Sequence, residues 1–365
     1  MKTTRLILVA GFLGAGKTTL LWEVARRIMD DGKRVGLITN DQAPGLVDTA
    51  ILSRNEVKVK EVSGSCFCCN FNGLINALQE VRDEANADVI IAEPVGSCTD
   101  LSATIIQPLR KNVGHELLIS PLTVMADPER LTDILKGGTS GLHPSAAYIF
   151  RKQLEESDII LISKTDKLKP NELVLLKEKV KLNFPEADVM TISAVSGEGI
   201  GDWLNEVTHR TDAGKRIVEV DYDVYAEGEA VLGWLNTTIE LKGEPTNWDH
   251  FARNLMQSLS QQFERLNAPV GHLKIILESG ENYLIANLTG LNGTLNFRGL
   301  AGVSTKARLT LNARVEMSPE ELERIVRETL DEYTTGNLTA RIVALRCLSP
   351  GRPNPTFRFD HIVRN

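Results

Sequence analysis

The chain carries close to its start the sequence Gly11-Phe12-Leu13-Gly14-Ala15-Gly16-Lys17-Thr18, which has the form G-x-x-x-x-G-K-[ST]. An apolar run, residues 6–10, precedes this stretch, and a helix-like segment from Thr19 to Met29 follows it. A strand, a glycine-rich loop and a helix in this order are typical of a phosphate-binding loop. The motif therefore predicts a P-loop fold, in which ligands bind at the carboxyl ends of parallel strands.

This loop supplies most of the predicted phosphate contacts. Its glycines let backbone N–H groups turn inward around phosphate oxygens, and the helix N-terminus adds a partial positive charge. Lys17 can reach the β and γ phosphates, and Thr18 can hold a magnesium ion. We expect the first part of a nucleotide site to consist of Gly11, Gly14, Ala15, Gly16, Lys17, Thr18 and Thr19.

The bulk composition sets limits on the class of protein. A chain of 365 residues suggests two domains. The net charge is −7 and the basic residues are scattered, so we expect neither nucleic acid nor an anionic membrane as partner. The apolar run near the N-terminus is better explained as a buried strand than as a signal peptide, and no apolar run approaches the ~20 residues of a membrane span. We expect a cytoplasmic protein.

Strand-like and helix-like patterns alternate through residue 210, which predicts a mainly parallel α/β sheet with helices on both faces. The strands are expected at 5–10, 34–39, 57–62, 89–92, 118–126, 158–163 and 188–192. The helices are expected at 18–31, 72–86, 98–111, 146–156, 171–183 and 200–209. Residues 211–228 are interpreted as a connector, residues 229–335 as a smaller α+β domain that recognises a client or partner, and residues 336–365 as an irregular tail.

Two segments point to guanine as the base. Ser163-Lys164-Thr165-Asp166 follows a predicted strand and resembles the N-K-x-D guanine motif, with serine in place of asparagine. A carboxylate at Asp166 can accept hydrogen bonds from the ring N–H and the exocyclic amine of guanine, a donor pair that adenine lacks. Ser193-Ala194 follows the next predicted strand, where a backbone N–H can contact the guanine carbonyl.

Acidic residues at other strand ends are candidates for catalysis. Glu93 ends an apolar strand and can hold magnesium directly or through water, and the N–H of Gly96, three residues on, can sense the γ-phosphate. Asp41, in the pair Asn40-Asp41, and Asp48 can position magnesium and the attacking water, although many turns carry Asn-Asp for conformational reasons alone. Lys17, Asp41, Asp48 and Glu93 are therefore the predicted catalytic residues.

Three of the five cysteines, Cys66, Cys68 and Cys69, fall within four residues. An odd number of clustered cysteines is a poor disulfide framework, and in a reducing compartment clustered thiols more often bind metal. Three soft ligands suit Zn²⁺ or a similar divalent metal, with a fourth position for water, another residue or a client. A redox thiol pair is the alternative function. Cys98 is interpreted as a small residue at a helix start.

In this order, the four motifs resemble those of the CobW-like GTPases, a family grouped with the UreG and HypB nickel-insertion GTPases. The motifs are Gly11–Thr18, Cys66-x-Cys68-Cys69, Glu93-x-x-Gly96 and Ser163–Asp166, and the resemblance covers residues 5 to 205. The resemblance implies slow GTP hydrolysis, for which Mg²⁺ is the expected cofactor. It also implies that the cysteines bind Zn²⁺ or a related metal, and that the protein delivers metal or helps with metallo-cofactor assembly.

The leading hypothesis is thus a GTP-hydrolysing metallochaperone in which hydrolysis moves the cysteine loop and so couples nucleotide state to metal affinity. Its expected partners are a client metalloprotein or metallo-cofactor enzyme and, in a nucleotide-dependent homodimer, a second copy of the chain. One alternative is a kinase or ligase that uses ATP on a small molecule, against which Asp166 argues. Another is an activator or assembly factor for a corrinoid enzyme, with Cys98 near the site.

Overall fold

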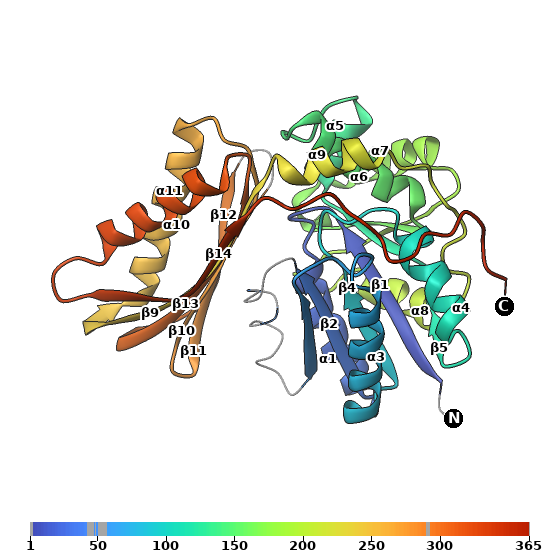
Figure 1. Ribbon diagram of the computed structural model, residues 1–365, viewed down its shortest axis with the longest axis horizontal. Helices are drawn as coiled ribbons and strands as arrows, with labels where there is room; N and C mark the ends of the chain where they lie inside the picture. Colours follow the sequence, from blue (N-terminus) through green and yellow to red (C-terminus); the bar gives the residue numbers. More distant parts are fainter. Residues whose placement is uncertain (1–2, 42–46, 48, 50–56, 290–292, 365) are drawn as a thin grey trace.

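The computed structural model describes residues 3–41, 47, 49, 57–289 and 293–364. Their strands form two separate sheets, one parallel and one antiparallel (Figure 1). The parallel sheet has the strand order β3-β2-β4-β1-β6-β7-β8, with β5 paired to β1. Its strands are β1 (Thr4–Gly11), β2 (Val35–Asp41), β3 (Lys58–Ser63), β4 (Val89–Glu93), β5 (Leu117–Ile119), β6 (Thr123–Ala126), β7 (Ile159–Ile162) and β8 (Asp188–Thr191).

Both faces of the parallel sheet are buried, because alternate residues of β1 enter different apolar clusters. Ile7 and Val9 pack with α1 (Lys17–Asp30) and α8 (Ile200–His209), whereas Leu6 and Leu8 belong to the cluster on the opposite face. That second cluster takes in residues of α3 (Phe71–Ala85), α4 (Gln107–Val113), α5 (Pro128–Leu135), α6 (Pro144–Glu156) and α7 (Pro170–Asn183). The predicted α/β fold with helices on both faces is confirmed.

Two predicted elements of this sheet are wrong in detail. The expected strand 118–126 is divided into β5 and β6 at Pro121, which has no N–H to donate to a ladder. The expected helix 98–111 begins only after Asp100, whose φ of 64° lies in the left-handed region, and its first turn, η1 (Ser102–Ile106), is π-helical. The 3-10 turn η2 (Thr165–Lys167) lies inside the predicted guanine motif.

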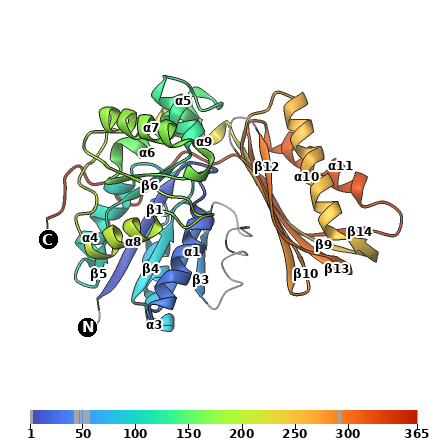
Figure 2. The same ribbon diagram turned by 180° about the vertical axis from the view of Figure 1, so that it is seen from behind.

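The antiparallel sheet has the strand order β12-β11-β10-β13-β9-β14. Its strands are β9 (Gly233–Asn247), β10 (Val270–Ser279), β11 (Asn282–Thr289), β12 (Thr294–Leu300), β13 (Val303–Val315) and β14 (Thr339–Leu348). The helices α10 (Trp248–Arg265) and α11 (Pro319–Tyr333) cover one face, where Leu273, Ile275 and Leu277 meet Trp248 and Ile325. The other face looks toward the parallel sheet (Figure 2).

The expected connector and tail both contain regular structure. The helix α9 (Tyr222–Ala230) lies largely within residues 211–228, and Asp221 caps it by accepting from the N–H groups of Asp223 and Val224. The expectation of an irregular tail over 336–365 is wrong for β14, which pairs along β9 from Thr339 to Leu348. After β14 the chain runs without regular structure back over the first domain (Figure 1).

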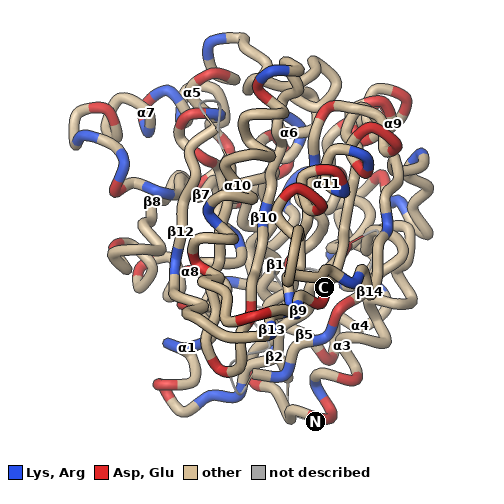
Figure 3. Tube along the Cα trace, turned by 90° about the vertical axis from the view of Figure 1, so that its left-hand side faces the viewer, with Lys and Arg blue, Asp and Glu red and all other residues tan. Residues whose placement is uncertain are grey.

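The distribution of charged and apolar residues in the structure agrees with the scattered charges and short apolar runs of the sequence. Lys and Arg alternate with Asp and Glu along the trace, and neither sign dominates the side shown in Figure 3. In the part of the chain that the structure describes, no helix combines the length and apolar character needed to cross a membrane.

Candidate nucleotide and thiol sites

The glycines of the P-loop hold a backbone that few other residues could adopt. Gly11, Gly14 and Gly16 have φ angles of 138°, 79° and 95°, and Gly16 stands as N-cap of α1. A Cβ atom on Gly11 would lie 2.4 Å from the carbonyl oxygen of Met125. The sequence therefore specifies this loop by conformation as well as by charge, and it brings the N-terminus of α1 to the edge of the sheet.

Lys17, the first residue of α1, lies close to Glu93 at the end of β4. The Lys17 ammonium donates to the carbonyl of Gly11 at 2.8 Å and lies 3.7 Å from Oε1 of Glu93. A Cβ on Gly96 would lie 3.3 Å from Lys17 Nζ and 2.8 Å from a methyl of Leu13. The segment from Glu93 to Gly96 thus lies directly against the P-loop, and glycine at position 96 is what lets it approach so closely.

A cavity of about 430 Å³ adjoins this loop. Its lining includes most of the predicted nucleotide contacts: Gly14, Ala15, Gly16, Lys17, Thr18, Thr19, Glu93, Ser163, Lys164, Asp166 and Ala194. The other predicted contacts, Gly11, Gly96 and Ser193, lie behind this lining and contact it.

The opposite wall of the cavity comes from the antiparallel sheet, which the sequence analysis did not predict. Lys274, Tyr283 and Arg298, from β10, β11 and β12, line it together with Trp22 of α1. The guanidinium of Arg298 lies over the Trp22 ring at 5.9 Å from its centroid. A sequence signal for this wall exists in β10, where Lys274 alternates with the buried Leu273 and Ile275 and so belongs to the face away from α10.

Ser163 and Lys164 fasten the predicted guanine motif to the P-loop. The Ser163 hydroxyl donates to the carbonyls of Ala15 and Ala126 at 2.8 and 3.1 Å. The Lys164 ammonium donates to the Gly14 carbonyl at 2.8 Å and to Asp127 at 2.7 Å. Serine at this position therefore makes the contact that joins the two loops, in spite of its difference from the motif.

Asp166 is exposed at the cavity wall and is oriented by the next strand end. The hydroxyl of the buried Ser193 donates to Asp166 Oδ1 at 2.6 Å, and the same hydroxyl accepts from the N–H of Ser196. The Ser193 turn thus fixes the carboxylate that the sequence analysis assigned to base recognition.

Asp41 lies outside the cavity lining, in a buried contact with the second sheet. Its Oδ2 accepts from Arg314 at 2.6 Å and from Asn236 at 3.2 Å, and the Asp41 and Arg314 side chains are each 3% exposed. The neighbouring predicted acid, Asp48, lies outside the described residues. The catalytic roles of Asp41 and Asp48 stay predictions.

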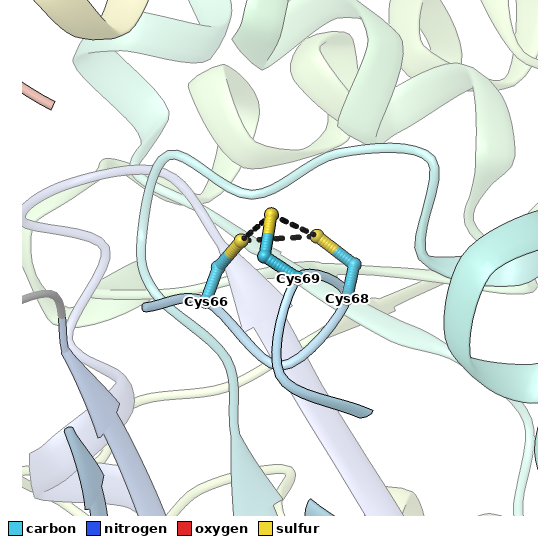
Figure 4. A group of neighbouring side chains, drawn as sticks. All are labelled: Cys66, Cys68 and Cys69. Atoms are coloured by element: carbon cyan, nitrogen blue, oxygen red, sulfur yellow. Dashed lines mark hydrogen bonds between the residues drawn. The ribbon is translucent and has the colours of Figure 1, made fainter. Parts of the chain in front are cut away.

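The three clustered thiols converge, as Figure 4 shows. Cys66 Sγ lies 3.0 Å from the Sγ atoms of both Cys68 and Cys69, which are 3.8 Å from each other. Among the described residues they form a group of three side chains whose ligand atoms all lie within 4.8 Å of one another and could hold a metal ion. Side-chain hydrogen bonds with the neighbouring thiols, first of all Cys68, lower the pKa of Cys66, and the hydrogen bond with Cys66 raises the pKa of Cys68. One thiolate surrounded by thiol donors is a suitable arrangement for a soft cation.

Asn40 connects the cysteine loop to the carboxyl end of β2. Its amide donates to the carbonyls of Val62 and Ser65, both at 2.8 Å, and accepts from the Phe67 N–H at 2.8 Å. Asn40 and Asp41 are consecutive residues. Asp41 contacts the second sheet and Asn40 holds the cysteine loop, so the two contacts are directly linked through the backbone.

The irregular segment after β14 covers the other side of the cysteine loop. The Thr356 N–H donates to the Cys68 carbonyl at 2.8 Å, and the Asn354 N–H donates to Cys69 Sγ at 3.3 Å. Beyond these contacts Phe357 meets Phe71 edge to face, and Arg358 pairs with Asp100 at 2.7 Å. The thiols are therefore enclosed by residues far apart in the sequence, which no local pattern indicated.

The parallel α/β fold and the loop Gly11–Thr18 define a P-loop nucleotide-binding protein, and the three clustered thiols add a second site to it. The chain belongs to the CobW/HypB/UreG family, whose nucleotide-binding domain model matches residues 5–191. This match confirms the resemblance drawn from the four motifs.

Curated relatives carry names that refer to zinc. The chain is 27% identical over 263 residues to the zinc chaperone CobW of Sinorhizobium sp, covering 62% of this chain and 72% of that one. It is 28% identical over 170 residues to the zinc chaperone YeiR of Escherichia coli (strain K12), covering 46% and 48%. It is 23% identical to the zinc-regulated GTPase metalloprotein activator 1 of Dictyostelium discoideum, covering 55% and 50%. The chain thus spans about half the length of the latter two relatives.

Similar solved structures include P-loop proteins with bound metal. Zn(II)-bound YjiA GTPase from E. coli is 18% identical and aligns over 92% of this chain and 100% of that one, with a TM-score of 0.36. HypB from Helicobacter pylori in complex with nickel is 17% identical and aligns over 60% and 92%, with a TM-score of 0.42.

Proposed function

We propose that this protein is a GTP-hydrolysing metallochaperone, in which the bound nucleotide controls how a divalent metal such as Zn²⁺ is held by Cys66, Cys68 and Cys69 and passed to a client metalloprotein. The observation that carries the proposal is the clamp formed by Asn40. Its three hydrogen bonds attach the thiol loop to the carboxyl end of β2, the second strand of the parallel sheet. A displacement of that strand end displaces the metal ligands with it.

Nucleotide binding in this proposal follows from the P-loop geometry. The N–H groups at the start of α1 and the Lys17 ammonium neutralise the phosphates, and Asp166 selects guanine. The Thr18 hydroxyl and the Glu93 carboxylate line the same cavity, and oxygen ligands of this kind suit Mg²⁺, which would neutralise charge on the phosphates.

Hydrolysis is assigned mainly to electrostatic stabilisation. In this proposal Lys17 and the loop amides stabilise the charge that develops on the γ-phosphoryl group, and Gly96 is close enough to Lys17 for its N–H to contact that group. Asp41 is held by Arg314 of the second sheet, so its proposed role in orienting water depends on how the two sheets sit together. This arrangement favours slow turnover.

The cellular setting of the proposal follows from the thiols. All five cysteines are free, and clustered reduced thiols require a reducing compartment, so we place the protein in the cytoplasm. The receiving client is a metalloprotein that competes for the ion with soft or imidazole ligands. A nucleotide-dependent homodimer stays a prediction.

The test is zinc affinity, measured by competition with a chromophoric chelator, in the GDP state and with a non-hydrolysable GTP analogue. We expect the two states to differ by at least about tenfold, or 1.4 kcal/mol. Lys17→Ala should remove the difference while zinc stays bound, and the triple variant Cys66→Ser/Cys68→Ser/Cys69→Ser should lose zinc while GTP stays bound. Equal zinc affinity of the native chain in both nucleotide states would overturn the proposal.

A further inference from the structure

A fourth thiol lies against the cluster. Cys98 is 1% exposed and shares a core cluster with Cys66 and Cys68. Its side chain interacts with the side chains of both, and it raises the number of thiols around the Cys66 sulfur to three. The sequence predicts Cys98 to be a small residue at a helix start, but the helix begins after Asp100 and leaves Cys98 in the loop that follows β4.

The loop that carries Cys98 is held in place on several sides. Gln153 of α6 donates to the carbonyls of Gly96 and Cys98 at 3.0 and 2.7 Å. The Cys98 N–H donates to the Val95 carbonyl at 2.9 Å, and the Ser97 hydroxyl donates to the buried carboxylate of Glu229. These hydrogen bonds fix the backbone around Cys98, and the fixed loop holds the Cys98 thiol beside the cluster.

The three clustered sulfurs have the spacing of a partial tetrahedron. Zn²⁺ binds thiolate sulfur at about 2.3 Å, which places tetrahedral sulfurs about 3.8 Å apart. The separations of 3.0, 3.0 and 3.8 Å need only small adjustments to reach this value. Among the described residues no fourth His, Cys, Asp or Glu, Cys98 included, has a ligand atom within 4.8 Å of all three sulfurs. A closed tetrahedron therefore has to draw its fourth protein ligand from a residue that moves slightly inward.

We propose that Cys98 is the fourth thiolate of a tetrahedral metal site with Cys66, Cys68 and Cys69. This deepens the proposed function and rests on it, since it takes this cluster to be the metal site. Binding of the ion displaces the remaining thiol protons to solvent and forms one metal–sulfur bond to each cysteine. Four thiolates with tetrahedral geometry select Zn²⁺ over Mg²⁺ or Ca²⁺, which take oxygen ligands.

The position of Cys98 gives its ligation a connection to the nucleotide. Only Ser97 stands between Cys98 and Gly96, so their two Cα atoms are at most about 7 Å apart, and Gly96 lies against Lys17. A shift of the loop toward the γ-phosphate position carries Cys98 with it. With Cys98 bound the ion is closed off by four sulfurs, and with Cys98 withdrawn a position opens through which a client ligand can enter.

The experiment counts sulfur ligands on the full-length protein. Zinc X-ray absorption and the visible spectrum of the Co²⁺-loaded protein are recorded for the native chain, Cys98→Ser, Cys98→Ala and the control Cys347→Ser, a half-buried cysteine of the second sheet. We expect four sulfurs in the native chain and three in both Cys98 variants. The sulfur-to-cobalt absorption should fall by about one quarter and zinc affinity at least about tenfold, since loss of even an outer contact costs this much. Cys347→Ser should match the native chain.

Folding is measured separately by chemical unfolding of the metal-free proteins. If a Cys98 variant does not fold, the sulfur count of the native chain still decides, because three sulfurs plus one oxygen or nitrogen there would overturn the inference. Identical spectra and affinities in native and Cys98 variants would overturn it as well and leave the three-cysteine metallochaperone intact. A native chain that binds no zinc would overturn the proposed function itself.

Discussion

Arg314 of β13 donates through Nη2 to Oδ2 of Asp41 at the end of β2, at 2.6 Å, and each side chain is 3% exposed. This ion pair joins the two sheets across 273 residues of sequence. The Arg314 guanidinium also lies over the ring of Trp234, 4.3 Å from its centroid. The end of β2, where Asn40 holds the thiol loop, is thereby held by the second domain.

Removal of this arginine should destabilise the protein strongly. Arg314→Ala leaves a buried carboxylate without its guanidinium, which costs about 3–5 kcal/mol in the free energy of unfolding. The matched control is Arg341→Ala, which breaks an ion pair with Glu240 whose arginine side chain is 71% exposed. The control should cost less than about 1 kcal/mol. Equal losses for the two variants in urea unfolding would show that the buried pair has no special weight.

Asn40→Ala should loosen the cysteine loop. The substitution removes three hydrogen bonds and leaves the Phe67 N–H and two carbonyls without this partner, so we expect a loss of about 2–4 kcal/mol in stability. Under the proposed coupling, zinc affinity should also lose its dependence on GTP or GDP. Asn70→Ala is the control, because Asn70 caps α3 through Gly73 and makes no such clamp. A nucleotide effect that survives in Asn40→Ala but not in Asn70→Ala would contradict the assignment.

Asp166→Ala should abolish discrimination between GTP and ITP. Inosine lacks the exocyclic amine of guanine, so a carboxylate that accepts from that amine favours GTP by roughly tenfold or more, as expected for a charged hydrogen bond. The variant should bind the two nucleotides equally. Asp202→Ala changes an exposed acid in the first turn of α8 and should keep the preference. Equilibrium binding of fluorescent nucleotides checks this, and a native chain indifferent to the amine would rule out Asp166 as the base contact.

Glu156 should make stability fall with rising pH. Burial raises the pKa of this carboxyl to about 8, against the hydrogen bonds donated by Thr99 and Ser102, which favour the ionised form. Between about pH 5 and pH 8 the unfolded chain ionises while the folded chain keeps the proton, so stability decreases through this window.

Glu156→Gln cannot ionise, so its stability relative to the native chain should rise across the same window, by at most about 1.4 kcal/mol per pH unit. Urea unfolding at several pH values measures the difference between the two proteins, in which other titrating groups cancel. Parallel curves from pH 5 to pH 8 would show that Glu156 is already ionised in the folded state.

Local chemistry made much of the first domain predictable. The P-loop, the buried strands and Glu93 follow from patterns within a few residues, and the structure brings most of the predicted cavity lining together. The strands β12 and β14 lie at opposite edges of their sheet, and neither contains a buried residue that would have indicated a core strand. The helix α9 was missed because it is short, contains Gly228 and has no marked apolar face.

The contacts that complete the sites could not be predicted, because each joins distant segments. Arg314 with Asp41, Cys98 with Cys66, and Lys274 in the cavity wall depend on how the elements pack. No periodicity within one segment encodes such a meeting. The sequence does give the chemical type of each residue. The three clustered thiols could therefore be predicted as a site, whereas the residues that contact them could not.

The segment that closes over the thiols has a consequence for how the protein is made. Asn354, which donates to the Cys69 sulfur, follows it by 285 residues. At a translation rate of 5–20 residues per second, the ribosome adds that lid roughly 15–60 s after the cysteines. During this interval the nascent polypeptide presents its sulfurs without the cover of residues 354–356, so both ion capture and oxidative damage can occur from a side that the finished protein covers.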